Sequence, residues 1–440
     1  MSNARSTTPT PFSVPDSAGP VFISYRRNDG AEIAAELAWI LRASGIPVWR
    51  DLDDLPPGDT EERLEQAVAE GLSGGVLVVT PDIVNSRIVK QTEAPGLIEF
   101  HEAHPQFALA IANDVKYATG GTDYTAPDRL LERRPGNLSG VDQKPADRAG
   151  LLALSKKLVQ HRIAQHRDIV AADARTLSIT VQTRNSAQVY DRTGAQLDIR
   201  IRRSNHDRLP DVDGLRDLKD TIDLLSDSYT RAGAQRVRLG GGAHLSVALA
   251  IGAALPTTRV RHTEVVDLEG DTWANGPVSS MSATPLTQIV QQGSNPALTL
   301  RHRPPVAMYV DMLQQRSDAA FQRFLDERGD TFAAWSHFRL TVDGPIDPAD
   351  AAWLAGEIAM RLREISSEHG NAEVHLLLRC PFALAVLVGT RLNTLRVVAY
   401  EWDDANADSP SDHRPVYVPA LRICPSSGAG VIEEVLLTVP

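Results

Sequence analysis

The sequence has few cysteines, no long apolar run and no excess of positive charge. Its two cysteines, Cys380 and Cys424, have a spacing that fits neither a zinc finger nor a disulfide framework, so a reducing compartment is expected. No stretch approaches the roughly 20 apolar residues of a membrane helix, and the first residues lack the basic and apolar regions of a secretory signal. We therefore expect a cytoplasmic protein with no membrane partner. The net charge of -11 disfavours binding to long nucleic acid, although a small anionic ligand can still bind locally.

Length and composition indicate two domains behind a short tail. A chain of 440 residues is longer than one hydrophobic core usually fills, and an apolar fraction of 42% is ordinary for a folded protein. Residues 1–19 are rich in Ser, Thr and Pro and are expected to be disordered. We predict one domain at residues 20–168 and a second at 177–440, joined by a linker at 169–176.

Short apolar runs alternate with helical patterns in the first domain. The predicted strands are Val21–Tyr25, Ile46–Trp49, Val76–Val79 and Phe107–Ile111, and the predicted helices are Ala31–Ser44, Glu61–Leu72 and Leu151–Val159. The polar stretch His161–Arg175 is predicted to lead into the second domain. This alternation implies an α/β fold with a parallel sheet covered on both faces, and functional groups in loops at the carboxyl ends of its strands.

The second domain contains a weak internal repeat. It begins with β-rich sequence at Leu177–Gln182 and Leu197–Ile201. Further on, Val237–Gly252 aligns without gaps on Val374–Gly389, and each segment predicts a strand, a tight turn and an apolar helix. Each is followed by another strand and then by a tryptophan, Trp273 or Trp402. The repeat predicts two βαβ-type halves that face each other across a shared crevice.

The first domain resembles the TIR family over about residues 20 to 150. Val21–Arg27, Gly45–Asp51 and Leu55–Gly58 have the order and separation of the family's first two boxes. The resemblance implies a flavodoxin-like parallel-sheet domain. Many TIR domains are scaffolds, whereas the enzymatic ones carry a glutamate on the helix after the third strand.

In this sequence Glu93 occupies the position of that glutamate. The segment from Pro81 to Glu93 matches the family pattern, except that Val89 stands where many relatives have tryptophan. Glu99 and Glu102 lie nearby and remain alternatives. The resemblance implies that Glu93 is the catalytic carboxylate of an NAD glycohydrolase, for which NAD is the substrate and no cofactor is needed. The alternative is a solvated helix glutamate.

The resemblance also implies substrate contacts around Glu93. Side chains at the end of the first strand are expected to hold adenine and pyrophosphate, and a tyrosine after the fourth strand, Tyr117 or Tyr124, can stack on substrate. The acidic loop Asp51–Gly58 corresponds to the loop by which TIR domains contact a neighbouring subunit. Each position has an ordinary alternative as surface or packing. The predicted contacts are Tyr25, Arg26, Arg27, Asp54 and Tyr124.

The second domain resembles the SAVED family over about residues 175 to 440. Gly241–Ser246, Ala250–Gly252, Tyr400–Trp402 and Pro415–Pro419 carry this resemblance. The family is similar to two fused CARF-like, Rossmann-like halves and senses cyclic oligonucleotides in bacterial anti-phage systems of the CBASS type. The resemblance implies a cyclic oligonucleotide partner, such as the cyclic trinucleotide cyclic tri-adenylate.

Candidate contacts for that ligand cluster in the two repeated units. Glycines after a strand let backbone approach a ligand, a helix start favours phosphate, and a tryptophan can stack on a base. A structural role is the alternative for each position. The predicted ligand contacts are Gly241, Gly242, His244, Ser246, Arg379, Cys380, Trp273 and Trp402. No metal site is predicted, because His101 and His104 are three apart, and Pro105 interrupts the helix.

Together these features predict an NAD hydrolase that is activated by a cyclic oligonucleotide. Activation is expected through head-to-tail, filament-like self-association. A non-catalytic adaptor that recruits partners when the sensor is occupied remains the alternative, as does a TIR fold that acts on another nucleotide.

Overall fold

The computed structural model describes residues 14–50, 71–184, 193–204, 208–276, 286–299, 303–341, 344–404 and 415–438. The chain forms two compact units. The boundary between them lies between His166 and Arg167, apart from short segments that belong to the other unit. Within the described residues, every helix is too short or too polar to cross a membrane.

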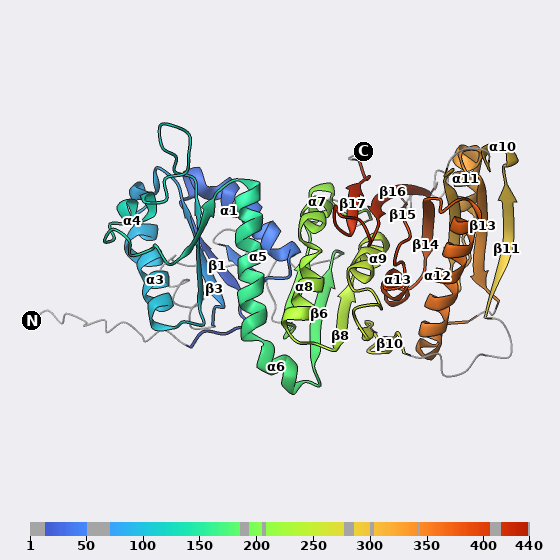
Figure 1. The fold of residues 1–440 in the computed structure, drawn as a ribbon, viewed down its shortest axis with the longest axis horizontal. Coiled ribbons are helices and arrows are strands. Elements are labelled where there is room, and N and C mark those ends of the chain that lie inside the picture. The colour runs from blue at the N-terminus through green and yellow to red at the C-terminus, as the bar shows by residue number, and fades with distance from the viewer. Residues whose placement is uncertain are drawn as a thin grey trace, which may run out of the picture. The chain divides into compact units, whose positions relative to one another are not determined.

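The amino-terminal unit is built on a five-stranded parallel sheet. The strand order is β2-β1-β3-β4-β5, which is the flavodoxin-like order, so the predicted fold class is confirmed (Figure 1). The strands are short and mostly buried, as their apolar runs require. Their bounds are β1 Val21–Ser24, β2 Val48–Arg50, β3 Gly74–Val79, β4 Ala108–Asn113 and β5 Asp142–Pro145.

The described helices of this unit lie between these strands or follow the last of them. They are α1 (Arg27–Ala43), α3 (Ala94–Ala103), α4 (Ala126–Leu130) and α5 (Arg148–Gln165). Asp147 caps the start of α5 by accepting a hydrogen bond from the Gly150 amide at 2.8 Å. The helices predicted at Ala31–Ser44 and Leu151–Val159 are confirmed. The one predicted at Glu61–Leu72 lies almost wholly outside the described residues.

The segment His161–Arg175 is more helical than predicted. Helix α5 continues to Gln165, and α6 (Arg167–Ala172) follows at once. Polar composition hid this continuation, because a helix needs only one apolar face, here including Ile163 and Val170. The segment predicted as a linker, 169–176, holds the end of α6 and the first residue of β6.

The carboxy-terminal unit contains two sheets of the same topology. The first has the order β7-β6-β8-β9-β10, and the second contains β13-β12-β14-β15-β16 with β11 and β17 added at its edges. In both, the first four strands are parallel and the fifth is antiparallel. The first sheet comprises β6 Thr176–Gln182, β7 Leu197–Arg200, β8 Arg236–Gly242, β9 His262–Val266 and β10 Thr272–Ala274. The second comprises β11 Thr287–Ser294, β12 Val306–Asp311, β13 Ala334–Leu340, β14 Val374–Arg379, β15 Val397–Asp403, β16 Val416–Ile423 and β17 Ile432–Val435.

This shared topology confirms the repeat seen in the sequence and extends it. The predicted strand-turn-helix units are β8 with α9 (Leu245–Ala254) and β14 with α13 (Phe382–Gly389). The β-rich segments predicted at Leu177–Gln182 and Leu197–Ile201 are β6 and β7 of the first half, and the structure adds β12 and β13 as their counterparts in the second. The remaining helices of this unit are α7 Val212–Thr221, α8 Leu224–Arg231, α10 Pro296–Thr299, α11 Ala319–Arg328 and α12 Ala351–Glu368.

The two halves meet where α9 packs against α13 (Figure 1). A Cβ added to Gly252 would lie 2.0 Å from the carbonyl oxygen of Val386, and one added to Gly389 would lie 2.2 Å from that of Leu249. These contacts are related by the repeat, which aligns Gly252 on Gly389 and Leu249 on Val386. The glycines therefore permit a close and nearly two-fold crossing of the helices.

We expect Gly252→Ala to destabilise the carboxy-terminal unit. The added methyl group would strike backbone, so the helices must separate, at a cost of about 1–3 kcal/mol that lowers the melting temperature by several degrees. Gly356→Ala is the matched control, because Gly356 lies in α12 and its Cβ would meet only a side-chain atom of Arg391 at 4.0 Å. Scanning calorimetry of both variants tests this. Equal melting temperatures would show that the crossing tolerates a side chain.

Candidate functional site

A hollow lies at the carboxyl ends of β1 and β3 in the amino-terminal unit. The strand order runs from β1 to β2 on one side and from β3 to β5 on the other, and this reversal point between β1 and β3 is where doubly wound sheets bind ligands. The hollow has a volume of about 390 Å³. Its lining residues come from the segment after β1 and from the segment that leads into α3: Tyr25, Arg26, Arg27, Asn28, Asn85, Ser86, Arg87, Ile88, Val89 and Glu93.

Glu93 is held rigidly in this hollow. It ends a π-helical turn, Val89–Glu93, that runs directly into α3. Its side chain is only 5% exposed, and the Ser24 hydroxyl, at the end of β1, donates a hydrogen bond to its Oε2 at 2.6 Å. Single π-helical turns inside α-helices occur frequently at functional sites. A buried carboxylate held in place can stabilise a positive charge that develops beside it.

The two alternative glutamates are placed differently. Glu99 and Glu102 lie farther along α3, are exposed and do not line the hollow. Glu102 accepts a hydrogen bond from Asn137 at 3.3 Å. Val89, which replaces the family's tryptophan, is buried among core residues and also lines the hollow. The geometry therefore favours Glu93 over its neighbours.

Cationic side chains border the hollow beside Glu93. The predicted contacts Tyr25, Arg26 and Arg27 all line it. Arg26 forms an ion pair with Asp29 at 3.1 Å and lies 3.9 Å from Asp82. Such guanidinium groups can bind the phosphate oxygens of an anionic ligand.

Sequence reasoning missed three polar residues on the other side of the hollow. Asn85, Ser86 and Arg87 lie just before the π-helical turn and line the hollow. Arg87 donates to the Gln91 side chain at 2.9 Å across one helical turn. The available signal was the family pattern that Pro81–Glu93 matches, because Ser86 begins it, three residues before Val89 and seven before Glu93.

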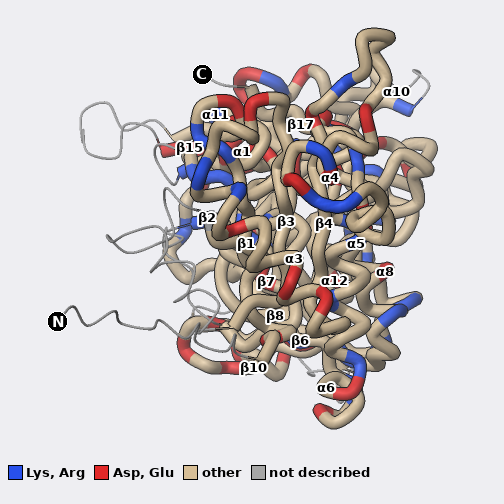
Figure 2. The backbone as a smooth tube through the Cα atoms, turned by 90° about the vertical axis from the view of Figure 1, so that its left-hand side faces the viewer, with Lys and Arg blue, Asp and Glu red and all other residues tan. Residues whose placement is uncertain are grey.

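The remaining predicted substrate contacts are not gathered with Glu93. Tyr117 and Tyr124 are half exposed and do not line the hollow. Between them, Asp123 is bound by Thr125 and Arg129, and these hydrogen bonds hold its pKa far below the usual value. Figure 2 shows that segments of both charges lie side by side around α4, where Arg129 lies. Asp54 lies outside the described residues.

In the carboxy-terminal unit, each half has its own reversal point. It lies between β6 and β8 in the first half, and between β12 and β14 in the second. The Thr183 amide donates to the Gly242 carbonyl at 3.2 Å, and the equivalent Met312 amide donates to the Arg379 carbonyl at 2.8 Å. Gly242 and Arg379 therefore occupy equivalent positions, as the repeat alignment indicates.

The predicted glycines have two different roles. Gly241 has a φ of +101°, and a Cβ there would lie 2.2 Å from the Val181 carbonyl oxygen, so strand packing requires this glycine. No atom lies within 4 Å of a Cβ added to Gly242. Of these two glycines, Gly242 leaves space into which a ligand can come close to the backbone.

The start of α9 is already occupied by a carboxylate. Glu401, from β15 of the other half, accepts a hydrogen bond from the Ser246 amide at 2.7 Å and is almost completely buried. Burial raises the pKa of Glu401, and the hydrogen bonds from the helix start oppose this rise. His244 is also buried, and its Nδ1 lies 2.8 Å from the Thr183 hydroxyl. A phosphate at the Ser246 amide would therefore have to displace Glu401.

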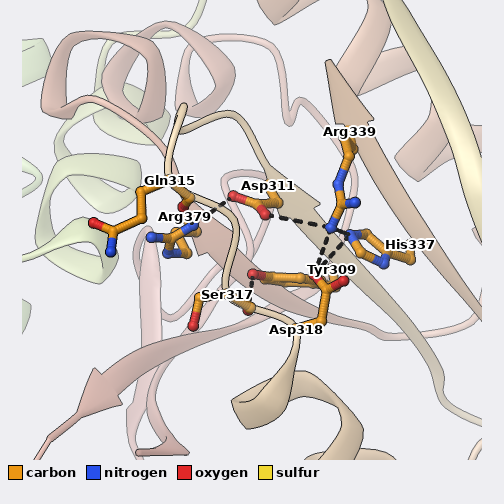
Figure 3. Close-up of polar contacts among 8 residues, drawn as sticks. All are labelled: Tyr309, Asp311, Gln315, Ser317, Asp318, His337, Arg339 and Arg379. Carbon is orange, nitrogen blue, oxygen red and sulfur yellow. Dashed lines mark hydrogen bonds and ion pairs between the residues drawn. The ribbon is translucent and has the colours of Figure 1, made fainter. Parts of the chain in front are cut away.

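Arg379 belongs to a polar cluster at the reversal point of the second half (Figure 3). Its Nη1 donates to Asp311 Oδ1 at 3.0 Å and to the Gln315 carbonyl. Arg339 lies 3.7 Å from Asp311 Oδ2, pairs with Asp318 and lies 3.2 Å from His337 Nε2. Burial raises the pKa of Asp311 and, aided by the nearby Arg339, lowers that of His337 to about 4.

Three members of this cluster have the chemistry of metal ligands. Ligand atoms of Asp311, Asp318 and His337 all lie within 4.8 Å of one another. The Arg339 guanidinium lies among them and supplies the positive charge (Figure 3). A metal ion there would have to displace Arg339, so the cluster is better described as an internal ion-pair network.

The last three predicted contacts differ in accessibility. Cys380 is buried, and burial raises the pKa of its thiol to about 12, so it is chemically inert. Trp273 is buried on β10, and its indole N–H donates to Asp267 at 2.8 Å. Trp402 is 37% exposed on β15. Trp402 is therefore the better placed of the two tryptophans to stack on a base.

Comparisons with solved structures find receptors with low similarity to this chain. The Acinetobacter baumannii Cap4 SAVED/CARF-domain containing receptor, solved with the cyclic trinucleotide 3'3'3'-cAAA, is 11% identical, covers 90% of this chain and 99% of its own, and has a TM-score of 0.43. The Moraxella osloensis Cap4 SAVED/CARF-domain containing receptor is 11% identical, covers 91% of this chain and 86% of its own, and has a TM-score of 0.37.

Two family models match the chain. The model of the TIR domain matches residues 21–116, which include β1 to β4 and Glu93. The model of the SMODS-associated and fused to various effectors sensor domain, SAVED, matches residues 216–423, which extend from α7 to the end of β16. Apart from residues 43–45, each match falls within one of the two compact units.

Proposed function

Because this chain joins a TIR domain to a SAVED sensor domain, we propose that it is an NAD glycohydrolase that a cyclic oligonucleotide switches on. The observation that carries this proposal is Glu93, a buried carboxylate held at the reversal point of the sheet, beside a hollow bordered by arginines. A scaffold domain does not need a fixed buried charge facing an open hollow. The chemistry of NAD cleavage does.

The nicotinamide of NAD is already a cationic leaving group. The bond between ribose C1' and the nicotinamide nitrogen breaks, the electron pair goes to the ring nitrogen, and positive charge develops on the ribose. Glu93 stabilises that charge, and no acid is needed to protonate the leaving group. Water then attacks C1' and loses a proton to solvent, which gives nicotinamide and ADP-ribose. Arg26, Arg27 and Tyr25 bind the pyrophosphate and the adenine.

The sensor ligand proposed here is a cyclic oligonucleotide, such as cyclic tri-adenylate. The SAVED match supports it, together with the equivalent reversal points of the two related halves. Gly242 leaves room for a close approach, Arg379 offers a guanidinium to phosphate, and Trp402 offers an exposed ring to a base. Such a protein serves anti-phage defence of the CBASS type by depleting NAD when the messenger appears.

The experiment that tests the catalytic half is simple. The full-length chain is incubated with NAD, with and without cyclic di-, tri- and tetranucleotides, and nicotinamide is measured by chromatography. Ligand-dependent release supports the hydrolase. Ligand binding without any release would favour the adaptor, and cleavage of a different nucleotide in the same assay would favour the third alternative.

We expect activation to proceed through head-to-tail assembly of ligand-bound subunits. A contact that does not close on itself generates filaments, and a weak contact between TIR domains becomes effective once the sensors bring them together. Specific activity with ligand should then rise steeply with protein concentration, in parallel with light scattering. Glu93→Gln is the control, because it should assemble without cleaving NAD. A ligand-bound monomer with full activity at every concentration would contradict the assembly mechanism.

A further inference from the structure

Ser24 and Glu93 meet although they lie 69 residues apart in the chain. Ser24 is the last residue of β1, and its side chain is buried. Its hydroxyl donates to Glu93 Oε2 at 2.6 Å, inside the range of a strong hydroxyl-to-carboxylate bond. The carboxyl end of β1 and the π-helical turn are thereby tied together at one side of the hollow.

The location of this hydrogen bond gives it a chemical consequence. A hydrogen bond to one oxygen restricts rotation of the carboxylate and favours its charged form over the protonated one. A carboxylate that stabilises an adjacent cation must be both charged and correctly aimed. Because both partners are buried, water does not readily replace this donor.

We propose that Ser24 is a positioning residue that keeps Glu93 ionised and oriented toward the hollow. This inference rests on the proposed function, since it assigns Ser24 to the same reaction. Ser24 acts through Glu93, because the hollow is lined by Glu93 and not by Ser24. The hydroxyl is the part of Ser24 that matters, not its volume.

Other ionisable groups around the hollow also influence the protonation of Glu93. Strands β3 and β4 carry no titratable side chain. Lys90, on the π-helical turn itself, pairs with Glu132. The groups that face the hollow or pair with those that do are Tyr25, Arg26, Arg27, Asp29, Asp82 and Arg87. All of them remain when Ser24 is changed, so a difference between variants reports the lost hydroxyl.

The first test compares pH–rate profiles of ligand-activated wild type, Ser24→Ala and Ser24→Thr. Loss of one hydrogen bond to the carboxylate should move the acid limb of Ser24→Ala upward by about one pH unit. Release of nicotinamide should then fall about tenfold on the acid side and recover toward the wild-type rate at higher pH. Ser24→Thr, which keeps the hydroxyl, should restore the wild-type profile. A loss of the same factor at every pH, or no loss, would overturn the inference.

The second test needs no turnover. The side-chain carboxyl carbon of Glu93 is labelled with ¹³C, assigned by its absence from Glu93→Gln, and titrated by NMR in the full chain. Its midpoint should lie about one pH unit higher in Ser24→Ala than in wild type. Equal midpoints would overturn the role of Ser24, whether or not NAD is cleaved. A shifted midpoint in a chain that releases no nicotinamide would keep the role of Ser24 and refute the proposed function.

Discussion

Glu93→Gln is expected to reduce ligand-activated nicotinamide release by at least about a hundredfold, the effect of losing one fixed electrostatic stabiliser. Glutamine keeps the shape of the side chain and can still accept from the Ser24 hydroxyl, but it carries no charge to offset the developing cation. Ligand binding and assembly should persist, because Glu93 belongs to the amino-terminal unit, whereas the proposed ligand site lies in the sensor. The measurement is the initial rate of nicotinamide release at saturating ligand.

Glu99→Gln is the matched control for this prediction. It removes the same charge six residues farther along the chain, but Glu99 is exposed and does not line the hollow. Its activity should stay close to that of wild type. If Glu93→Gln remained fully active, or if Glu99→Gln lost activity instead, the assignment of the carboxylate would be wrong.

In the sensor, Trp402→Ala combined with Arg379→Gln is expected to abolish activation at ligand concentrations that saturate wild type. Base stacking on an aromatic ring contributes about 1–3 kcal/mol, and a charge-assisted hydrogen bond contributes about 1.5–3 kcal/mol. Each single change should therefore weaken binding by about tenfold or more, and the double change by at least about a hundredfold. Isothermal titration calorimetry with cyclic tri-adenylate measures both.

The control for Arg379 is Arg361→Gln. Arg361 lies on α12, where it pairs with Glu357 and Glu364, so the substitution also removes a charge from ion pairs. It should leave ligand affinity unchanged. Unchanged affinity in Trp402→Ala and Arg379→Gln as well would place the ligand elsewhere in the sensor, while leaving the proposed chemistry at Glu93 intact.

Local sequence patterns were sufficient to predict much of this fold. The apolar runs at β1, β3 and β4 match the predicted strands closely, because buried parallel strands are continuously apolar. The alignment of Val237–Gly252 on Val374–Gly389 located both strand-turn-helix units. It also paired Gly252 with Gly389, although their role at the helix crossing appears only in three dimensions.

Contacts between distant residues could not be predicted in this way. The Ser24 hydroxyl and Glu93 are separated by 69 residues, and a helical period of 3.6 does not indicate the π-helical turn that orients Glu93. Glu401 accepts a hydrogen bond from Ser246 at the start of α9, although the two residues are 155 positions apart. The run of glycines was predicted to serve a ligand, but Gly241 is required by the nearby Val181 carbonyl. Local patterns identify elements, whereas these contacts depend on how the elements pack.

The central claim is that ligand in the sensor switches on NAD cleavage at Glu93. Its most direct test is a titration of full-length protein with cyclic tri-adenylate, in which bound ligand and the rate of nicotinamide release are measured in the same samples, for wild type and Glu93→Gln. The account predicts equal ligand binding by both proteins and a rate that is negligible without ligand, rises with occupancy in wild type and stays near zero in Glu93→Gln. A rate that is independent of occupancy, or equal in the two proteins, would contradict it.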